Sequence, residues 1–188
     1  MSSAKEIHKT MHKNITDLDL KRYLPETNSP NDNVIKYSEL ADIDSLDEIL
    51  PHDKSFKIVL IEDSYNSGHW CAILRYGKTY EWFDSYGIGI DEELKFIDSL
   101  QKKLLGQDRK YLTKLLEKLP KKTTKVVWNK RKLQSIANDS NTCGRWCILR
   151  IVTMTDFGFD LKQFHEFIDT WKKKLKLSPD EMVSLWVK

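Results

Sequence analysis

The sequence predicts an α+β domain with a central, mostly antiparallel sheet flanked by helices. Three β-branched and aromatic runs follow one another at 56–63, 69–76 and 78–86, with turn residues between them. Downstream of them, apolar residues recur at helical spacing. The chain has 188 residues, 40% of them hydrophobic, with only 7 Gly and 5 Pro, which is the composition of one compact globular domain. We therefore expect a single domain over 1–188.

The first 33 residues are expected to form an arm lying on a core made by 34–188. They are rich in Asn, Asp, Thr, Ser and Lys, and Pro25 and Pro30 prevent one long helix. Short helices are predicted next, at 36–41 and 45–50.

The three central runs predict a meander, and the last two of them predict a hairpin about Gly77-Lys78. Five helices and one further strand should follow. They are a helix opened by Asp91, a second ending at Pro120, a strand at 124–129, a mostly buried helix at 143–157, a helix from Asp160 or Leu161 to Leu175, and a last helix capped by Ser178.

Several classes of protein are disfavoured by composition. No apolar run reaches the roughly 18 residues needed to span a bilayer, and the N-terminal residues lack the apolar core of a signal peptide. We expect a soluble protein that is not secreted and does not bind membranes. The three cysteines, Cys71, Cys143 and Cys147, are too few and odd in number for a disulfide framework, which favours reduced thiols.

Cys143 is the candidate nucleophile. It follows a polar loop and precedes Gly144 and a long apolar run, so its sulfur should lie at a helix N-terminus, where the dipole and free amides favour the thiolate. The alternative is a buried structural cysteine, since free Cys is among the most buried residue types. Cys71 within a strand and Cys147 one turn into the helix are both expected to be core thiols.

His69 is the candidate base, and Asp84 is the candidate group that orients it. His69 begins a strand, and pairing of 69–76 with 78–84 predicts that Asp84 is its cross-strand neighbour at the open end of the hairpin. A carboxylate there can hold the imidazole tautomer and stabilise the imidazolium. A structural histidine and a plain turn aspartate are the alternatives.

Gln134 lies nine residues before the candidate nucleophile. Its side-chain amide is a candidate donor to the oxyanion of a tetrahedral intermediate, with the Cys143 backbone N–H as the second donor. Surface glutamines are common, so an ordinary surface role is the alternative.

The order His69, Asp84, Gln134 and Cys143, with the strings GHW, WFDSYG, LQ and NTCGRWC, resembles the adenovirus-type (adenain-like) viral maturation cysteine proteases. These are relatives of the SUMO-deconjugating proteases, and TCGRW with an upstream LQ looks most like the virophage and polinton-like virus members. The resemblance covers roughly 56–157. The step from Gln134 to Cys143 is longer than in many members, which makes Gln134 the weakest match.

The resemblance implies an α+β relative of papain that cleaves peptide bonds through a thioester acyl-enzyme and needs no metal. It implies that Cys143 attacks, His69 transfers the proton, Asp84 orients His69, and Gln134 stabilises the oxyanion. The implied substrates are viral capsid and virion precursor proteins, and the implied location is the virion and the infected host cell, in its cytoplasm or virus factory. DNA or a viral peptide would be an activating cofactor, and we expect a monomer.

The net charge of +3 hides a basic segment. Residues 102–132 contain 12 Lys or Arg and 2 Asp or Glu, so they carry +10 and the rest carries −7. A solvated helix face is the ordinary explanation. The other is DNA contact, with Trp128 stacking on a base. The candidate DNA contacts are Lys121, Lys122, Lys125, Lys130, Arg131 and Lys132.

Three other functions compete with a maturation protease. A ubiquitin-like-protein deconjugase would use the same chemistry with a broad docking surface. A non-enzymatic nucleic-acid-binding virion protein predicts an inert Cys143. A zinc-binding interaction module built on His69, Cys71, Cys143 and Cys147 lacks the usual knuckle spacing.

Overall fold

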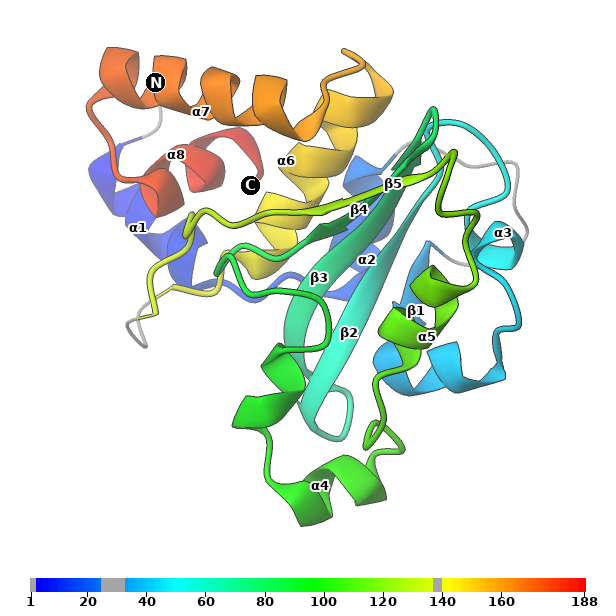
Figure 1. Ribbon diagram of the computed structural model, residues 1–188. Coiled ribbons are helices and arrows are strands. Elements are labelled where there is room, and N and C mark those ends of the chain that lie inside the picture. Colours follow the sequence, from blue (N-terminus) through cyan, green and yellow to red (C-terminus); the bar gives the residue numbers. More distant parts are fainter. Residues whose placement is uncertain (1–2, 25–32, 137–139) are drawn as a thin grey trace.

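The computed structural model confirms the α+β class, with a five-stranded sheet lying between two groups of helices (Figure 1). It describes residues 3–24, 33–136 and 140–188. Pro25 and Pro30, predicted to interrupt the N-terminal arm, lie outside the described residues. Over the described ranges, no helix is both long and apolar enough to cross a bilayer.

The three central strands are antiparallel, as predicted, and the two edge strands join them in parallel. The spatial order follows the chain from β1 to β5. The edge strand β1 was not predicted, because three residues are too few to show an alternating pattern. The strands are β1 (Val34–Lys36), β2 (Phe56–Ser64), β3 (Ser67–Tyr76), β4 (Thr79–Phe83) and β5 (Lys125–Trp128).

The hairpin between β3 and β4 is confirmed, but its register differs by two residues from the predicted one. Tyr76 pairs with Thr79 across the turn, and the ladder ends where Ala72 pairs with Phe83. Gly77 adopts a left-handed φ of 54°, which two-residue hairpin turns require and glycine tolerates. The turn is therefore centred one residue later than predicted.

His69 and Asp84 are consequently not cross-strand partners, and that prediction is wrong. Continuing the observed register places Tyr86 opposite His69, beyond the last paired residues. A shift of two residues keeps each side chain on its own face of the strand. Asp84 therefore still lies on the same face of the sheet as His69, which explains why the two side chains meet although the pairing differs.

Each face of the sheet carries its own buried core. Ile58 and Leu60 of β2 pack with the largely buried helix α6 (Cys143–Thr155), while Val59 and Ile61 face the opposite side. Burial on both faces explains the uninterrupted apolar run of β2. The helices η1 (Tyr37–Asp42), α3 (Leu46–Ile49) and α5 (Tyr111–Glu117) cover the second face.

The last helices follow the sequence pattern closely. The structure confirms the long buried helix α6, then α7 (Leu161–Leu175) and α8 (Pro179–Trp186), with Ser178 as the cap of α8. In Figure 1 all three lie on the same side of the sheet. The arm contributes α1 (Ala4–His12), which packs against α8, and α2 (Asp17–Tyr23), which contacts α6.

The single helix predicted from Asp91 does not form. Asp91 has a left-handed φ of 60°, which is incompatible with a right-handed helix. The segment instead forms the 3-10 helix η2 (Glu93–Phe96) and the short helix α4 (Ser99–Leu104). Leu100 and Leu104, which lie on the apolar side of the expected helical pattern, are 65% and 73% exposed, because α4 projects from the body of the protein (Figure 1).

Candidate active site

The structure brings His69, Asp84 and Cys143 together near the start of β3, beyond the last residues that pair β3 with β4. The His69 Nε2 atom lies 3.0 Å from Asp84 Oδ1, and the Cys143 thiol lies close enough to the His69 side chain for the histidine to lower the pKa of the thiol. Because Nε2 faces the carboxylate, Nδ1 is left for the thiol. Asp84 is fully buried, and the His69 side chain is 11% exposed. The imidazole is thus placed between an acid that orients it and a thiol it can deprotonate.

Cys143 is the first residue of α6, as the sequence predicted. Gly144 is tightly surrounded, since a Cβ there would lie 3.1 Å from the Ile15 side chain and 3.2 Å from the Trp70 side chain, both of which would have to shift. The backbone groups of Trp70 and Gly144 also lower the pKa of the Cys143 thiol. Cys143 is only half-buried, which leaves it accessible to a substrate.

The surroundings favour a charged Cys143–His69 pair. Burial alone would raise the pKa of the Cys143 thiol, but the hydrogen bond and positive charge of His69 lower it below its ordinary value. Burial alone would lower the pKa of the His69 imidazole, but Cys71, Glu93 and Asp84 beside the ring raise it well above its ordinary value. Both shifts favour the thiolate–imidazolium form, which is the reactive state of a thiol nucleophile.

Tyr86 covers the imidazole and was missed by the sequence analysis. Its ring stacks on His69, with centroids 4.6 Å apart and planes inclined by 21°. Its backbone amide donates to Asp84 Oδ1 over 2.7 Å, so the same residue also fixes the carboxylate. Its place follows from the observed hairpin register, whose continuation places Tyr86 opposite His69, and the register predicted from the sequence did not give this.

Two further side chains, Glu93 and Cys71, lie beside His69 and were not predicted as part of the site. Glu93 Oε2 lies 3.8 Å from His69 Nε2, and the Cys71 thiol donates to Glu93 Oε2 over 3.6 Å. Burial raises the pKa of Glu93 to about 7, with Asp84 adding to the effect and His69 opposing it. Cys71 is a buried thiol, as predicted, but it faces the site rather than a purely apolar core.

The position of Glu93 follows from the left-handed Asp91 two residues earlier. The Asp91 carboxylate is buried, where it accepts hydrogen bonds from the Tyr37 hydroxyl and the Thr113 amide. These bonds fix the start of η2, and η2 then carries Glu93 to the histidine. No local sequence pattern encodes this long-range arrangement.

Gln134 is buried within the loop that leads toward the nucleophile. Its Oε1 accepts from the Ser85 hydroxyl over 2.7 Å, and its Nε2 donates to the Ser140 carbonyl over 2.9 Å. A side-chain amide nitrogen carries two protons, so this bond uses one of them. Gln134 therefore connects the residue after Asp84 with the loop before Cys143. The sequence alternative of an ordinary surface glutamine is wrong, because Gln134 is 2% exposed.

Asp180, at the start of α8, anchors the segments around the nucleophile. Its carboxylate accepts from the Thr142 hydroxyl, the Ser135 amide and the Trp146 indole. Cys143 is thereby fixed by a residue far along the chain, which no sequence pattern connects with the nucleophile.

A cleft of about 580 Å³ opens beside Cys143. The N-terminal arm forms one wall, where Ile15 accepts a hydrogen bond from the Trp70 indole through its carbonyl. Asp63 near the end of β2 and Asn66 in the β2–β3 turn form another wall. The cleft gives an extended ligand a route to the sulfur.

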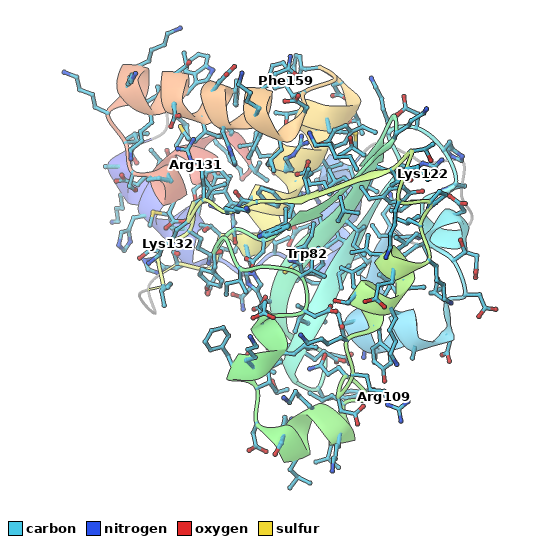
Figure 2. The ribbon with its side chains drawn as sticks, viewed as in Figure 1. Trp82, Arg109, Lys122, Arg131, Lys132 and Phe159 are labelled. Carbon is cyan, nitrogen blue, oxygen red and sulfur yellow. The ribbon has the colours of Figure 1, made fainter. Side chains whose placement is uncertain are left out.

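None of the basic residues predicted as DNA contacts lines the cleft beside Cys143. Figure 2 shows Lys122 near one end of β5, and Arg131 and Lys132 beyond the other end. Lys125 and Lys130 line a pocket that also contains Trp128, and Lys130 Nζ lies 4.4 Å from the centroid of the Trp128 ring. Arg131 forms an ion pair with Asp169, while Lys121 and Lys132 are exposed. They form a stripe along the edge strand rather than one cluster.

The chain is similar to a virophage protein. It is 34% identical over 154 residues to the protein described as "Uncharacterized protein V9" of Sputnik virophage, and the match covers 81% of this chain and 83% of the relative. The chain belongs to the V9 family. No family model matches it.

Two solved structures align with this V9-family chain over most of its length. One is the central domain of the uncharacterized Lpg1148 protein from Legionella pneumophila, with 16% identity, a TM-score of 0.37, and coverage of 91% of this chain and 97% of the other. The other is the SUMO protease Ulp1 with its catalytic cysteine oxidized to a sulfinic acid, with 13% identity, a TM-score of 0.35, and coverage of 98% and 78%. At these TM-scores neither likeness bears on the chemistry of this chain.

Proposed function

We propose that the protein is a papain-like, adenain-type cysteine endopeptidase that processes viral capsid or virion precursor proteins. The observation that supports the chemistry is the position of the His69 ring, which has the Asp84 carboxylate on Nε2 and the Cys143 thiol as its other partner. A thiol, an imidazole and a buried acid in this order form the arrangement that activates a thiol nucleophile. Membership of a family that includes a virophage protein supports the viral context.

The proposed reaction begins with transfer of the Cys143 proton to His69 Nδ1. The thiolate attacks the scissile carbonyl, His69 then protonates the leaving amine, and a thioester acyl-enzyme remains. Water, deprotonated by His69, hydrolyses the thioester and regenerates the thiol. Asp84 holds the imidazole orientation and stabilises its positive charge throughout.

Two donors are assigned to the oxyanion in this proposal. The Cys143 backbone N–H lies at the free N-terminal end of α6, where the helix dipole favours negative charge. The second donor is the Gln134 amide proton that is not used by Ser140. A donor of this kind typically lowers the barrier by about 3–4 kcal/mol. No metal takes part in these steps.

The first test of the proposal is alkylation of the folded protein with iodoacetamide near pH 6, mapped by mass spectrometry. We expect rapid labelling of Cys143 alone, because the thiol is half-buried and its pKa is lowered by His69. His69→Ala should slow that labelling sharply. Cys71 and Cys147 are buried and serve as controls within the same molecule. Slow and equal labelling of all three cysteines would contradict the proposed nucleophile.

The substrate class needs a separate test. Co-expression with a capsid precursor should give discrete cleavage by the wild type and none by Cys143→Ala, whereas SUMO and ubiquitin conjugates should remain intact. If the conjugates are cleaved while the capsid precursor stays intact, the result would favour a ubiquitin-like-protein deconjugase. The proposed enzyme acts as a monomer in the virion and infected cell, with DNA or a viral peptide as a candidate activator.

A further inference from the structure

We infer that His69, Cys71, Asp84 and Glu93 form a binding site for a zinc-like transition-metal ion. Occupancy of this site would switch off the base proposed above. The existence of the site does not depend on protease activity, whereas its inhibitory effect rests on the proposed function. The ion is not needed for peptide cleavage and instead competes with it.

The spacing of the four side chains fits a tetrahedral ion. One ligand atom from each residue lies within 4.8 Å of all the others. The contacts are 3.0 Å from His69 Nε2 to Asp84 Oδ1, 3.8 Å from Nε2 to Glu93 Oε2, and 3.6 Å from Cys71 Sγ to the same Glu93 oxygen. Tetrahedral zinc with metal–ligand distances of about 2.0–2.3 Å separates neighbouring ligand atoms by roughly 3.3–3.7 Å. Since the four atoms lie up to 4.8 Å apart, the most distant of them must approach by about 1 Å when the ion binds.

The chemistry of the donor set selects the kind of ion. An imidazole, a thiolate and two carboxylates suit Zn²⁺ and similar transition-metal ions, whereas Ca²⁺ and Mg²⁺ prefer oxygen ligands alone. This set differs from His69, Cys71, Cys143 and Cys147, the zinc set considered from the sequence. Within the described part of the chain, the gathered group contains two carboxylates in place of the two helical cysteines.

A polar atom without a partner supports the assignment. Asp84 Oδ2 is buried and has no hydrogen-bond partner among the described residues, although the other oxygen of the same carboxylate bonds both His69 and Tyr86. A buried carboxylate oxygen ordinarily needs a proton donor or a cation. The His69 and Glu93 side chains are 11% and 12% exposed, so an ion can reach the group from the surface.

Binding would stop catalysis through His69. The Nε2 proton and the Cys71 thiol proton leave to solvent when these atoms bind the ion. The neutral, metal-bound imidazole then keeps its remaining proton on Nδ1, so the ring can neither accept a proton from the Cys143 thiol nor act as the imidazolium that protonates the leaving amine. Cys143 itself does not bind the ion, which distinguishes this form of inhibition from direct coordination of the nucleophile by the metal.

Titration of the full chain with Co²⁺ under argon tests the site by spectroscopy rather than activity. We expect one ion per chain, displaceable by Zn²⁺, with a near-ultraviolet sulfur-to-cobalt charge-transfer band. The band should disappear in Cys71→Ala and persist in Cys143→Ala and Cys147→Ala, which are matched thiol deletions. If Cys71→Ala does not fold, Glu93→Gln on the partly exposed rim should weaken binding about 10-fold or more.

Two results would overturn the site. One is a charge-transfer band that survives in Cys71→Ala but disappears in Cys143→Ala, because the nucleophile would then be the ligand. The other is no band in the wild type at saturating Co²⁺. A band that depends on Cys71 in a protein without peptidase activity would support the metal site and count against the proposed function. Peptidase activity without any band would do the reverse.

Discussion

The two nitrogens of His69 meet different groups, and this difference determines what the residue can do. Nε2 faces Asp84 and Glu93, while the thiol of Cys143 approaches the ring as a separate partner. Tyr86 stacks on the ring and supports this orientation. The imidazole is therefore held in one orientation before a substrate binds.

Asp84→Asn tests the role of the acid. An amide has the same shape but cannot stabilise the imidazolium, so we expect cleavage to fall on the order of 10³- to 10⁴-fold with little change in KM. Cleavage assays and iodoacetamide labelling of Cys143 should both report the loss. Asp63→Asn, at an exposed cleft residue, is the matched control and should leave labelling unchanged. Full activity of Asp84→Asn would exclude the assigned role.

Gln134→Ala separates stabilisation of the oxyanion from activation of the nucleophile. Loss of an oxyanion donor should lower kcat on the order of 10²- to 10³-fold, while iodoacetamide labelling of Cys143 stays near the wild-type rate because no oxyanion forms in alkylation. Ser85→Ala removes only the hydroxyl partner of Gln134 and is the control. A parallel loss of labelling and cleavage in Gln134→Ala would show that Gln134 only positions the loop.

At the scale of elements, a buried ion pair joins α6 to β4. Arg150 and Glu81 are both fully buried and form two hydrogen bonds of 2.8 Å, one from Nε and one from the terminal nitrogen. This contact orients the helix whose first residue is Cys143. A charged pair in this position fixes the docking of the helix only while both partners are present.

Arg150→Met should destabilise the fold by about 3–5 kcal/mol, because the Glu81 carboxylate is left buried without its partner. Urea unfolding followed by circular dichroism measures the change. The double variant Arg150→Met/Glu81→Leu should recover at least half of that loss, since it removes both buried charges. A single-variant effect below about 1 kcal/mol would contradict this role of the pair.

The contact between α7 and the end of β5 predicts a pH dependence. Burial lowers the pKa of His165 to about 4, with the charges of Arg131 and Arg150 adding to the effect. The unfolded chain, where the pKa is about 6.5, then binds more protons between about pH 4 and pH 6.5, so stability is lost as pH falls through this window. Because the ring is half-buried, we expect a loss of about 1 kcal/mol.

Urea midpoints at pH 7 and pH 5 measure this effect. His165→Gln, which can keep a hydrogen bond to Asn129, should show a smaller drop between the two pH values than the wild type. Equal drops in the two proteins would assign the acid sensitivity to other groups.

At the scale of the whole molecule, positive charge follows one sheet edge, and the pocket there shares no lining residue with the cleft beside Cys143. Trp128 is 37% exposed on the edge strand, with Lys125 and Lys130 lining the same pocket. An aromatic face beside ammonium groups suits single-stranded nucleic acid. DNA contact at this surface therefore stays a prediction, and it is independent of the peptidase chemistry.

Single-stranded DNA binding should weaken steeply as salt increases, because lysines displace counterions from the phosphates. Lys125→Ala and Lys130→Ala should each reduce the slope of log affinity against log salt by about 1. Fluorescence anisotropy across a salt series measures the slope. Lys5→Ala, on α1 away from this edge, is the control. Binding that does not change with salt would exclude phosphate contact.

The long elements could be predicted because their patterns are local. The central strands and the helices α6, α7 and α8 each carry an uninterrupted period or a cap in their own residues. The three-residue β1 and the segment after Asp91 could not be predicted. Their conformations depend on parallel pairing with β2 and on contacts of the buried Asp91 with Tyr37 and Thr113.

The sequence by itself determined the α+β class and the candidates His69, Asp84, Gln134 and Cys143. Side-chain chemistry and the signals for a helix start depend only on residues that are neighbours in the chain. Only the tertiary structure decided which groups surround the histidine. A two-residue change in register brought Tyr86 onto the ring, and a left-handed Asp91 turned Glu93 toward it beside Cys71. These contacts depend on packing between distant segments, which no local pattern encodes.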